Sequence, residues 1–515
     1  MATFYNATTS GILPGHALPP QLAQLWSHEL GWLSGALPPV TPVDQQFELT
    51  PRTGAALVLA FVCGLLANAA GVGGGPFYIP LFNVLLGFNL KVSAALSHTV
   101  VSASALASTL YGLRQTSPRD PNRPLLDVDL ALTFIPALLL GVSFGVLFNV
   151  LIPEWLQTIL LVLLLAFVIR NTARKARKQW AAEKAARTKD ASAVAPLAAA
   201  REPLLPAHES HDVESAPPPK DEHADAAAGL ARKGTLLQLL EMEDHPGGVF
   251  HEEAFFPHDK THGAAAPEPP TRQREQPRGM LARIPFGKLA EIVVLWLLFL
   301  YSQQLKSRYG RCTWQYLSIL AGQAAVLVSF AAGQIWYQVR KAATRPHDLD
   351  PELRVILAAD AEREPGKPHP ARALAQVAGV MALAGMTAGL LGIGGALLFN
   401  PWLLQLGVHP QVTASTAVLM ILFSSSAIAL SLSFQGLLSH SYALVFAPVC
   451  FAASLVGVTL IGRVVRQSGR ASIIVIILTV VITAGTVVTG VFGGIRSYEQ
   501  IVNGGDIGFH PICTR

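Results

Sequence analysis

The chain has 515 residues, of which 51% are hydrophobic and only 14% are charged. Charged residues make up roughly a quarter of an average soluble domain, so this composition excludes an ordinary soluble protein and favours a polytopic membrane protein. The formal net charge of +5 comes largely from basic residues that flank apolar segments. It is therefore information about membrane topology and does not indicate a nucleic-acid partner.

Composition divides the chain into two membrane halves joined by a polar insert. The predicted parts are an N-terminal non-membrane segment (1–53), a first transmembrane repeat (54–172), a disordered cytoplasmic insert (173–285), a linking transmembrane hairpin (286–340), a cytoplasmic linker (341–371), a second transmembrane repeat (372–493) and a C-terminal tail (494–515). The insert is rich in Ala, Pro, Glu, His and Lys and cannot bury enough apolar surface to offset its ordering entropy. Its histidines lack a fixed ligand spacing, which favours solvated linker residues over a metal site.

The apolar segments occur in two matching sets of five, separated by two segments without a counterpart. The first set is predicted at 54–70, 75–90, 92–113, 128–150 and 155–171, the unmatched pair at 287–305 and 314–338, and the second set at 372–391, 395–407, 410–434, 441–462 and 471–493. About 20 helical residues are needed to cross the hydrocarbon core, so the second segment of each set is short for a span. The sequence leaves open whether these two segments span the membrane or re-enter it.

Two glycine clusters interrupt the apolar stretches at equivalent places. The cluster that begins at Gly392 follows the one that begins at Gly71 by 321 positions, and Pro80 matches Pro401 at the same offset. After a one-residue slip, Val92 matches the later valine at 412. Paired apolar segments broken by Gly and Pro in corresponding halves indicate a substrate site made from broken helices near the bilayer midplane.

Basic residues orient the two halves in opposite directions. The connection 114–127 contains three arginines, and a basic cluster follows residue 169, so both are predicted to be cytoplasmic. In the second half the connection 435–440 has no Lys or Arg, and the basic cluster instead follows the fourth segment, at 463–470. This antiphase predicts an inverted repeat, although a duplication with parallel halves stays open.

Several motifs resemble the TauE/SafE sulfite exporter family, in its plant-type branch. The strongest is the run NAAGVGGG from Asn68 to Gly75, with the stretch that follows at 88–99. Further similar motifs lie at 127–132, 145–150, 410–414, 469–472 and 508–513. The resemblance covers nearly all of 54–515 outside the insert. It implies a transmembrane carrier of small sulfur oxyanions such as sulfite or sulfoacetate, whereas the long insert departs from the compact bacterial members.

An oxyanion needs hydrogen-bond donors in a place of low dielectric constant. A helix that restarts after a glycine break presents free backbone N–H groups and the positive end of its dipole. The alternative is that such glycines only allow tight helix packing, which is the role we expect for Gly141 and Gly145. The predicted backbone donors lie at the two clusters, with the Asn68 side chain beside the first: Gly71, Gly73, Gly74, Gly75, Gly392, Gly394 and Gly395.

Side-chain donors are expected from the segments that follow the breaks. His98 is an ionisable group deep in an apolar segment, and such residues are functional candidates by default. Its imidazole could donate to the anion and bind a coupling proton, or it could be a packed, hydrogen-bonded residue. Membrane hydroxyls often bond only their own helix. The remaining candidates are Ser97, Thr99, Thr413, Ser415 and Thr416.

The four cysteines fall into two pairs. Cys63 and Cys450 lie within apolar segments and are predicted to be small packing residues. Cys312 and Cys513 are both predicted on the non-cytoplasmic side, where an oxidising compartment would allow them to form a disulfide.

The sequence therefore predicts an all-α secondary transporter of sulfite, sulfoacetate or sulfate that works by alternating access between inverted repeats. No Walker motif occurs, so direct ATP drive is not expected, and neither enzymatic activity, a cofactor nor a metal is predicted. The expected partners are the oxyanion, the lipid bilayer and a coupling proton, and the protein is expected in the plasma membrane or an endomembrane. The alternatives are an anion channel on the same scaffold and a membrane sensor or adaptor that acts through the insert. The oligomeric state stays open.

Overall fold

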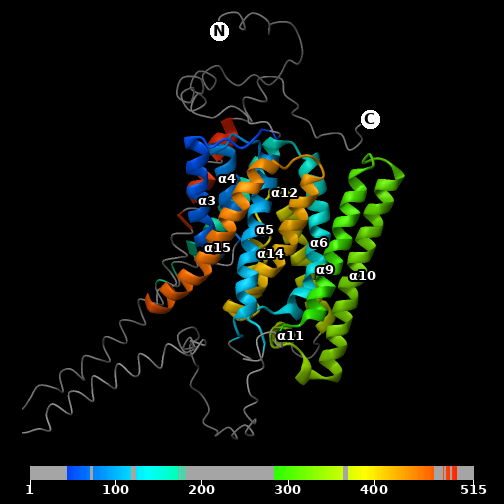
Figure 1. Cartoon of the computed structure of the whole chain (residues 1–515). Coiled ribbons are helices and arrows are strands. Elements are labelled where there is room, and N and C mark those ends of the chain that lie inside the picture. Colours follow the sequence, from blue (N-terminus) through cyan, green and yellow to red (C-terminus); the bar gives the residue numbers. More distant parts are fainter. Residues whose placement is uncertain are drawn as a thin grey trace, which may run out of the picture.

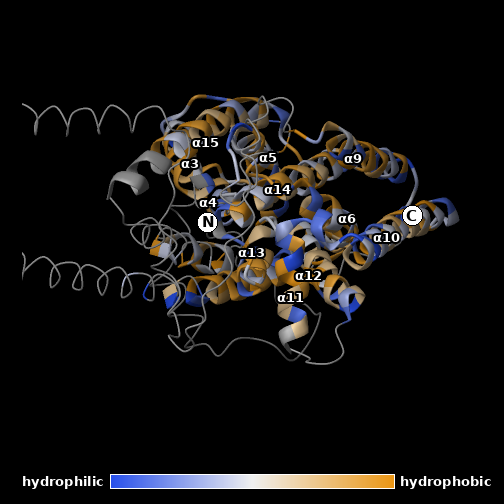
Figure 2. Cartoon of the chain, turned by 90° about the horizontal axis from the view of Figure 1, so that it is seen from below, coloured by the Kyte–Doolittle hydropathy of each residue, from blue (hydrophilic) through white to orange (hydrophobic). Residues whose placement is uncertain are grey.

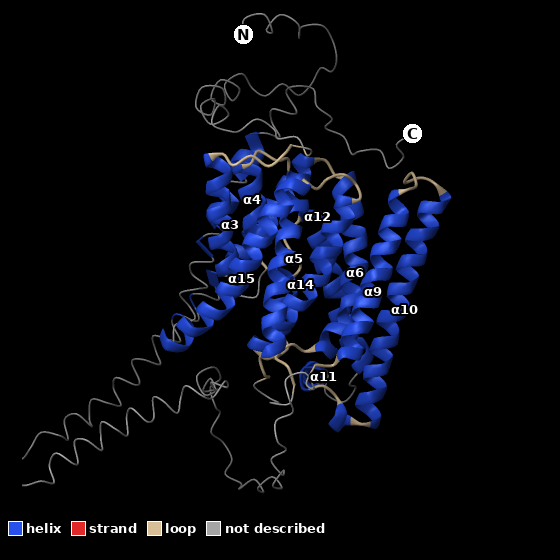
Figure 3. Cartoon of the chain, viewed as in Figure 1, coloured by secondary structure: helices blue, strands red, loops and turns tan. Residues whose placement is uncertain are grey.

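A computed structural model of the chain describes residues 45–69, 73–117, 123–171, 284–363 and 369–468, with shorter pieces at 43, 173–174, 177, 180 and within 479–495. These residues are helical and contain no strand (Figure 3), apart from an isolated bridge between Thr116 and Pro124. The predicted insert lies almost entirely outside the described residues, as does most of the predicted segment 471–493.

Nine of the described helices are long and apolar enough to cross a membrane, which confirms the predicted polytopic helical bundle. In chain order the described elements are α3 (Pro51–Ala69), α4 (Gly75–Leu85), α5 (Leu90–Arg114), α6 (Val128–Leu151), an unlabelled helix (Glu154–Asn171), α9 (Phe286–Ser307), α10 (Trp314–Thr344), the 3₁₀ turn η3 (Pro346–Asp348), α11 (Pro351–Arg363), α12 (Pro370–Leu391), α13 (Ala396–Gln405), α14 (Pro410–Ser433) and α15 (His440–Ser468).

Side-chain caps define where the central helices begin. Asn89 accepts the backbone N–H of Val92 at the start of α5, and Asp127 accepts that of Leu130 at the start of α6. An N-cap of this type satisfies one of the N–H groups that a first helical turn leaves unbonded. The polar connections therefore end sharply where the apolar helices begin.

Two contacts establish the directions of the central helices. Lys91, at the start of α5, donates to the carbonyl of Val150 at the end of α6, at 3.2 Å. Thr416, near the start of α14, accepts the N–H of Asp127, which caps α6, at 2.9 Å. Consequently α5 is antiparallel to α6, α14 is parallel to α6, and α5 and α14 run in opposite directions (Figure 1).

The bundle has two ends, with α11 at one of them and the connection between α9 and α10 at the other (Figure 1). We call the end with the connection 114–127 and α11 the inner end, because its arginines predict a cytoplasmic location. The end with the connection 308–313 between α9 and α10 is the outer end. Seen from below, the helices are mostly coloured as hydrophobic (Figure 2). Many of their large apolar side chains are exposed. Such a surface suits lipid contact, and the protein is a multi-pass integral membrane protein.

The two halves pack across each other. The main partner of α6, the fourth helix of the first half, is α12, the first helix of the second half; correspondingly, α15 packs along α3. The third helices, α5 and α14, pack together between these pairs (Figure 1). Each half therefore completes its own packing with a helix of the other.

Glycines bring α6 and α12 into backbone contact. A Cβ placed on Gly141 would lie on the carbonyl oxygen of Ala382, and one on Gly145 on that of Met386. Gly385 of α12 approaches the α6 backbone in the same way. This is the small-residue packing of membrane helices, and it confirms the packing role predicted for Gly141 and Gly145.

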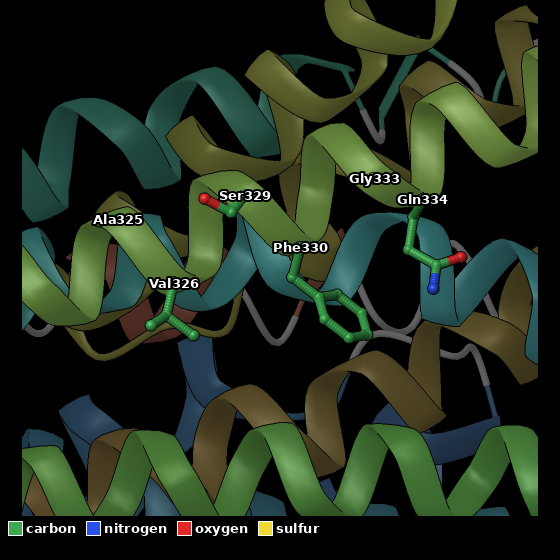
Figure 4. A pocket seen from close by; sticks show the side chains of 6 residues that line it. All are labelled: Ala325, Val326, Ser329, Phe330, Gly333 and Gln334. Carbon is green, nitrogen blue, oxygen red and sulfur yellow. The ribbon is translucent and has the colours of Figure 1, made fainter.

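The hairpin of α9 and α10 lies beside α6 (Figure 1). Lys288 of α9 forms an ion pair with Asp129 of α6 at 2.6 Å, and Gln338 of α10 donates to Thr133 of α6 at 3.4 Å. A hollow of 530 Å³ runs along α10 (Figure 4) and offers an oxyanion little besides apolar surface. Its lining residues are Ala325, Val326, Ser329, Phe330, Gly333 and Gln334.

Candidate functional site

Both glycine clusters break the helix, as predicted. Gly74 has φ 77° at the start of α4, and Gly392 has φ 78° at the end of α12, a left-handed backbone that a residue with a Cβ rarely adopts. With 11 and 10 residues, α4 and α13 reach at most roughly 16 Å, too short to cross a hydrocarbon core of about 30 Å. Gly71 lies outside the described residues.

The two breaks touch each other. A Cβ placed on Gly75 would lie 2.6 Å from both the carbonyl carbon and the carbonyl oxygen of Ile393. The hydroxyl of Ser97, on α5, lies between the breaks and within reach of the carbonyls of Gly75 (3.5 Å) and Gly392 (3.4 Å). The two glycine breaks are 321 positions apart in the chain, yet they lie together and Ser97 contacts both of them. We call this place the centre.

His98 connects α5 to the last turn of α12. Its Nε2 lies 3.0 Å from the carbonyl oxygen of Ala388, and because a carbonyl only accepts, Nε2 bears the hydrogen. The ring is fully buried, and Nδ1 has no hydrogen-bond partner among the described residues. In the neutral ring Nδ1 presents a lone pair, and in the protonated ring it presents a second N–H.

The first turns of α4 and α13 begin at this centre. The first N–H groups of a helix have no acceptor within the helix. Pro76 removes one of these donors from α4, whereas Ala396 and Leu397 at the start of α13 both have an N–H group. The next N–H groups, of Leu398 and Phe399, bond the Gly395 carbonyl at 3.0 and 3.3 Å. The backbone of Gly394 and Gly395 leads into α13 and is buried, so its N–H groups lie away from bulk water.

The other first-half candidates bond their own helices. The side-chain amide of Asn68 donates to the carbonyl of Gly64 at 2.8 Å, and its Oδ1 is buried without a partner among the described residues. Thr99 donates to Ala95, one turn earlier on α5, at 3.0 Å. Thr99 therefore follows the local pattern of membrane hydroxyls.

The second-half hydroxyls lie nearer the inner end. Thr416 is fully buried and bonds the N–H of Asp127. Thr413 is buried, and its hydroxyl has no partner in the described part of the chain, whereas Ser415 is half-buried. No recorded contact joins these three, among the described residues, to the second glycine break. Their role in the site stays a prediction.

Two apolar residues at the centre were missed by the sequence analysis. A Cβ on Gly73, where φ is 80°, would lie 3.2 Å from Ile421 of α14 and 3.4 Å from Val101 of α5. These two side chains are separated by 320 positions, the offset at which the third segments of the two repeats match. Applying that offset to apolar positions as well as polar ones would have identified both.

A buried carboxyl group occupies the inner end, below Thr416. Asp127 is largely buried, and its neighbour Asp350 pairs with Arg123 at 2.5 Å. The pKa of Asp127 is raised well above its ordinary value, chiefly by burial and then by the nearby Asp350 carboxylate. The sequence analysis gave this aspartate no role beyond its place in a family-like motif.

Comparison with known proteins agrees with this architecture. The family model "Sulfite exporter TauE/SafE" matches residues 22–171 and 292–486, the two halves without the insert. The chain belongs to this family. "Sulfite exporter TauE/SafE family protein 2" of Arabidopsis thaliana is 28% identical over 477 residues, which are 91% of this chain and 89% of that protein. Family protein 1 of the same plant is 29% identical over 476 residues, or 90% and 89% of the two chains. No solved structure matches.

The TauE/SafE membership confirms the family predicted from the motifs, and it agrees with the described helices. The matched ranges contain both glycine breaks and all of α5, α6, α12, α13 and α14. The residues at the centre therefore belong to the part of the chain that the family shares, whereas the insert does not.

The cysteines of this TauE/SafE chain differ in state. Cys312, in the outer connection of the hairpin, is disulfide-bonded, whereas Cys63 and Cys450 are free thiols within the helices. Cys513 lies outside the described residues, so its predicted pairing with Cys312 stays a prediction.

The buried Asp127 predicts a pH-dependent stability. Because its folded pKa is raised, the folded state holds a proton that the unfolded chain releases earlier. The free energy of unfolding then falls by up to about 1.4 kcal/mol per pH unit as pH rises from the ordinary aspartate pKa towards the raised one. In Asp127→Asn, which keeps an N-cap, the melting temperature in detergent should vary less between pH 5 and 8 than in the wild type. The exposed Asp348→Asn should keep the wild-type slope; a wild-type slope in Asp127→Asn would contradict the prediction.

Proposed function

We propose that this protein is a secondary transporter of small sulfur-containing oxyanions, namely sulfite, sulfoacetate or sulfate, which bind where the two glycine breaks meet. The observation on which the proposal rests is the contact of Gly75 with Ile393, with Ser97 against both breaks. The family and the printed names of its Arabidopsis members, sulfite exporters, support the substrate class.

The chemistry of the centre suits an oxyanion. Helix starts at α4 and α13 supply N–H groups and the positive ends of two helix dipoles, in a buried place where electrostatic attraction is stronger than in water. Ser97 adds a hydroxyl, and His98 adds an imidazole whose Nδ1 is unoccupied among the described residues. The proposed binding set keeps the full predicted list, with Thr413, Ser415 and Thr416 forming the path from the inner end.

Alternating access is supported by the way the halves are related. The first helix of each half packs against the fourth helix of the other half: α3 against α15, and α12 against α6. The equivalent third helices, α5 and α14, run in opposite directions. This is the arrangement that an inverted repeat predicts. The two halves can then exchange inner-open and outer-open conformations around the fixed contact between the breaks.

Proton coupling follows from the hydrogen bonding of His98. While Nε2 donates to Ala388, Nδ1 of the neutral ring can only accept and would repel an oxyanion. Protonation turns Nδ1 into a donor, so the anion and the proton favour each other's binding. The His98 site thereby couples anion movement to a proton gradient.

The proposal is tested by uptake of labelled sulfite into proteoliposomes, with and without an imposed pH gradient, and with sulfate and sulfoacetate as competitors. His98→Gln keeps an amide donor for the Ala388 carbonyl but cannot titrate. Uptake should saturate in the wild type and be accelerated by the gradient, and His98→Gln should lose that acceleration. We expect the acceleration by the gradient to fall by roughly 5- to 150-fold, which corresponds to typical coupling free energies between two sites.

Matched controls separate the possible outcomes. The exposed His347→Gln, at the inner end, should respond to the gradient as the wild type does. Flux that never saturates would contradict alternating access and favour the anion channel. A wild-type gradient response in His98→Gln would contradict proton coupling through this residue. Absence of uptake of all three anions would contradict the substrate class.

A further inference from the structure

Lys306 is a second ionisable group buried within the membrane region. The sequence analysis ended this apolar segment at residue 305, but α9 continues to Ser307 and so includes the lysine. Only 5% of Lys306 is exposed. An amine near a helix end normally extends towards water, so its burial needs an explanation.

The ammonium group is held by neutral side chains from two other helices. Nζ donates to Oε1 of Gln323 on α10 at 2.7 Å and lies 3.4 Å from the hydroxyl of Ser143 on α6. That hydroxyl also donates to Gln323, at 3.1 Å. Gln323 is nine residues into α10, roughly 13 Å along the helix, so Lys306 extends inward from the outer end.

The cluster has more donors than acceptors. An ammonium group has three hydrogens, and Lys306 has two recorded acceptors. The side-chain Nε2 of Gln323 is buried without a partner, and so is that of Gln303, one turn before Lys306 on α9. Buried polar groups are nearly always hydrogen-bonded, so these amides mark a missing acceptor among the described residues.

No carboxylate compensates the charge of Lys306 in the described part of the chain. Glu154, at the same end, interacts instead with Lys91. The sequence from 292 to 347 contains no Asp or Glu, although its outer turn contains Arg308 and Arg311 besides Lys306. Membrane proteins usually have their basic residues at the cytoplasmic end, so a basic cluster at the outer end is unusual. An anionic ligand bound there would explain it.

Other polar residues at the interface between this hairpin and α6 have partners of opposite kind. On the α6 face that contacts the hairpin, Asp129 is paired with Lys288, and Thr133 bonds Gln338. Ser143 lies further along that helix and meets the unpaired cation. The two lysines of α9 therefore differ: Lys306 has no recorded counter-charge among the described residues, whereas Lys288 has one and provides the matched control.

We propose that Lys306, Gln303, Gln323 and Ser143 form a second anion site, between the hairpin and α6, for a tetrahedral oxyanion of the phosphate type. The group is either a free ion or the headgroup phosphate of an anionic phospholipid, which basic sites between transmembrane helices can bind. The site is distinct from the centre at the glycine breaks, because α9 and α10 have no counterpart in the repeat. Its occupant joins the hairpin to the transport core.

The test measures thermal stability of the full chain, purified and delipidated in detergent. Sodium phosphate, at ionic strength held constant with chloride, forms one arm; phosphatidylglycerol, compared with phosphatidylcholine, forms the other. We expect the melting temperature to rise by about 2–4 °C in at least one arm. Lys306→Met should lose this rise, whereas Lys288→Met, His98→Gln and the charge-keeping Lys306→Arg should keep it.

The two arms identify the source of the ligand. A rise with phosphate alone indicates a free ion, and a rise with phosphatidylglycerol alone indicates a headgroup; either supports the site if Lys306→Met removes it. Gln303→Leu serves if Lys306→Met does not fold, and it should reduce the rise at least severalfold. The site is overturned if neither arm stabilises the wild type, or if the rise persists in the foldable member of these two variants.

Discussion

Gly141→Ala is expected to prevent stable assembly of the two halves. The new methyl group would lie on the carbonyl oxygen of Ala382 and 2.8 Å from the backbone nitrogen of Met386. These are backbone atoms of α12, so no side-chain rotation can relieve the overlap. Overpacking typically lowers the free energy of unfolding by about 1–3 kcal/mol, and we expect Gly141→Ala to reach or exceed the upper end of this range. This is a large share of a total stability of about 5–15 kcal/mol.

The yield and the melting temperature of monodisperse protein in detergent measure this effect. Gly379→Ala is the matched control, because Gly379 lies within α12 and a Cβ there would meet no atom within 4 Å. The control should be neutral or slightly stabilising, since alanine favours the helix over glycine by roughly 0.5–1 kcal/mol. Wild-type yield and melting temperature in Gly141→Ala would show that the helices do not approach as described.

Gly75→Ala should abolish transport by separating the two breaks. Its Cβ would lie 2.6 Å from the Ile393 carbonyl and 3.0 Å from the Ile393 Cα, so the first turn of α4 must move away from the second break. Ser97 could then no longer reach Gly75 and Gly392 together. In enzymes a displacement of about 1 Å costs roughly 100-fold, and we expect a loss of transport of that order.

Sulfite uptake per folded molecule separates this effect from misfolding. Gly54→Ala, in the first turn of α3, meets no atom within 4 Å and should transport as the wild type does. Gly395→Ala is an intermediate case, because its Cβ would lie 3.1 Å from the Ala384 carbonyl oxygen and a small shift suffices. Equal uptake by Gly75→Ala and Gly54→Ala would rule out the contact between the breaks as a requirement for transport.

Much of the fold follows from local chemistry that the sequence displays. Hydropathy placed most of the helices, and the spacing of Gly141 and Gly145 predicted a close helix contact, because only glycine permits that approach. The ends were less accurate where polar residues continue a helix. Lys306 is the clearest case: a lysine was taken as the end of the segment, yet its neighbours on α6 and α10 bury it.

The candidate site was predictable in its residues but not in its contacts. Ser97 and His98 stand out as polar groups in an apolar helix, which any reading of the sequence can find. Their partners are backbone carbonyls 295 and 290 positions away, and carbonyls have no signature in a sequence. Thr416 likewise has a backbone partner that the sequence does not indicate, because its hydroxyl accepts a hydrogen bond from the N–H of Asp127, and its role in the site stays a prediction.

The exchange of partners between the halves bears on how the protein is made. As the first half leaves the ribosome, the glycine face of α6 has nothing to pack against until α12 has been synthesised, more than 200 residues later. During that interval α3 also lacks α15, so neither interface can close within a single half. The first half must therefore remain inserted but incompletely packed while the insert, the hairpin and α11 are synthesised. Correct maturation is then a late event in synthesis, decided when the second half meets helices already in the bilayer.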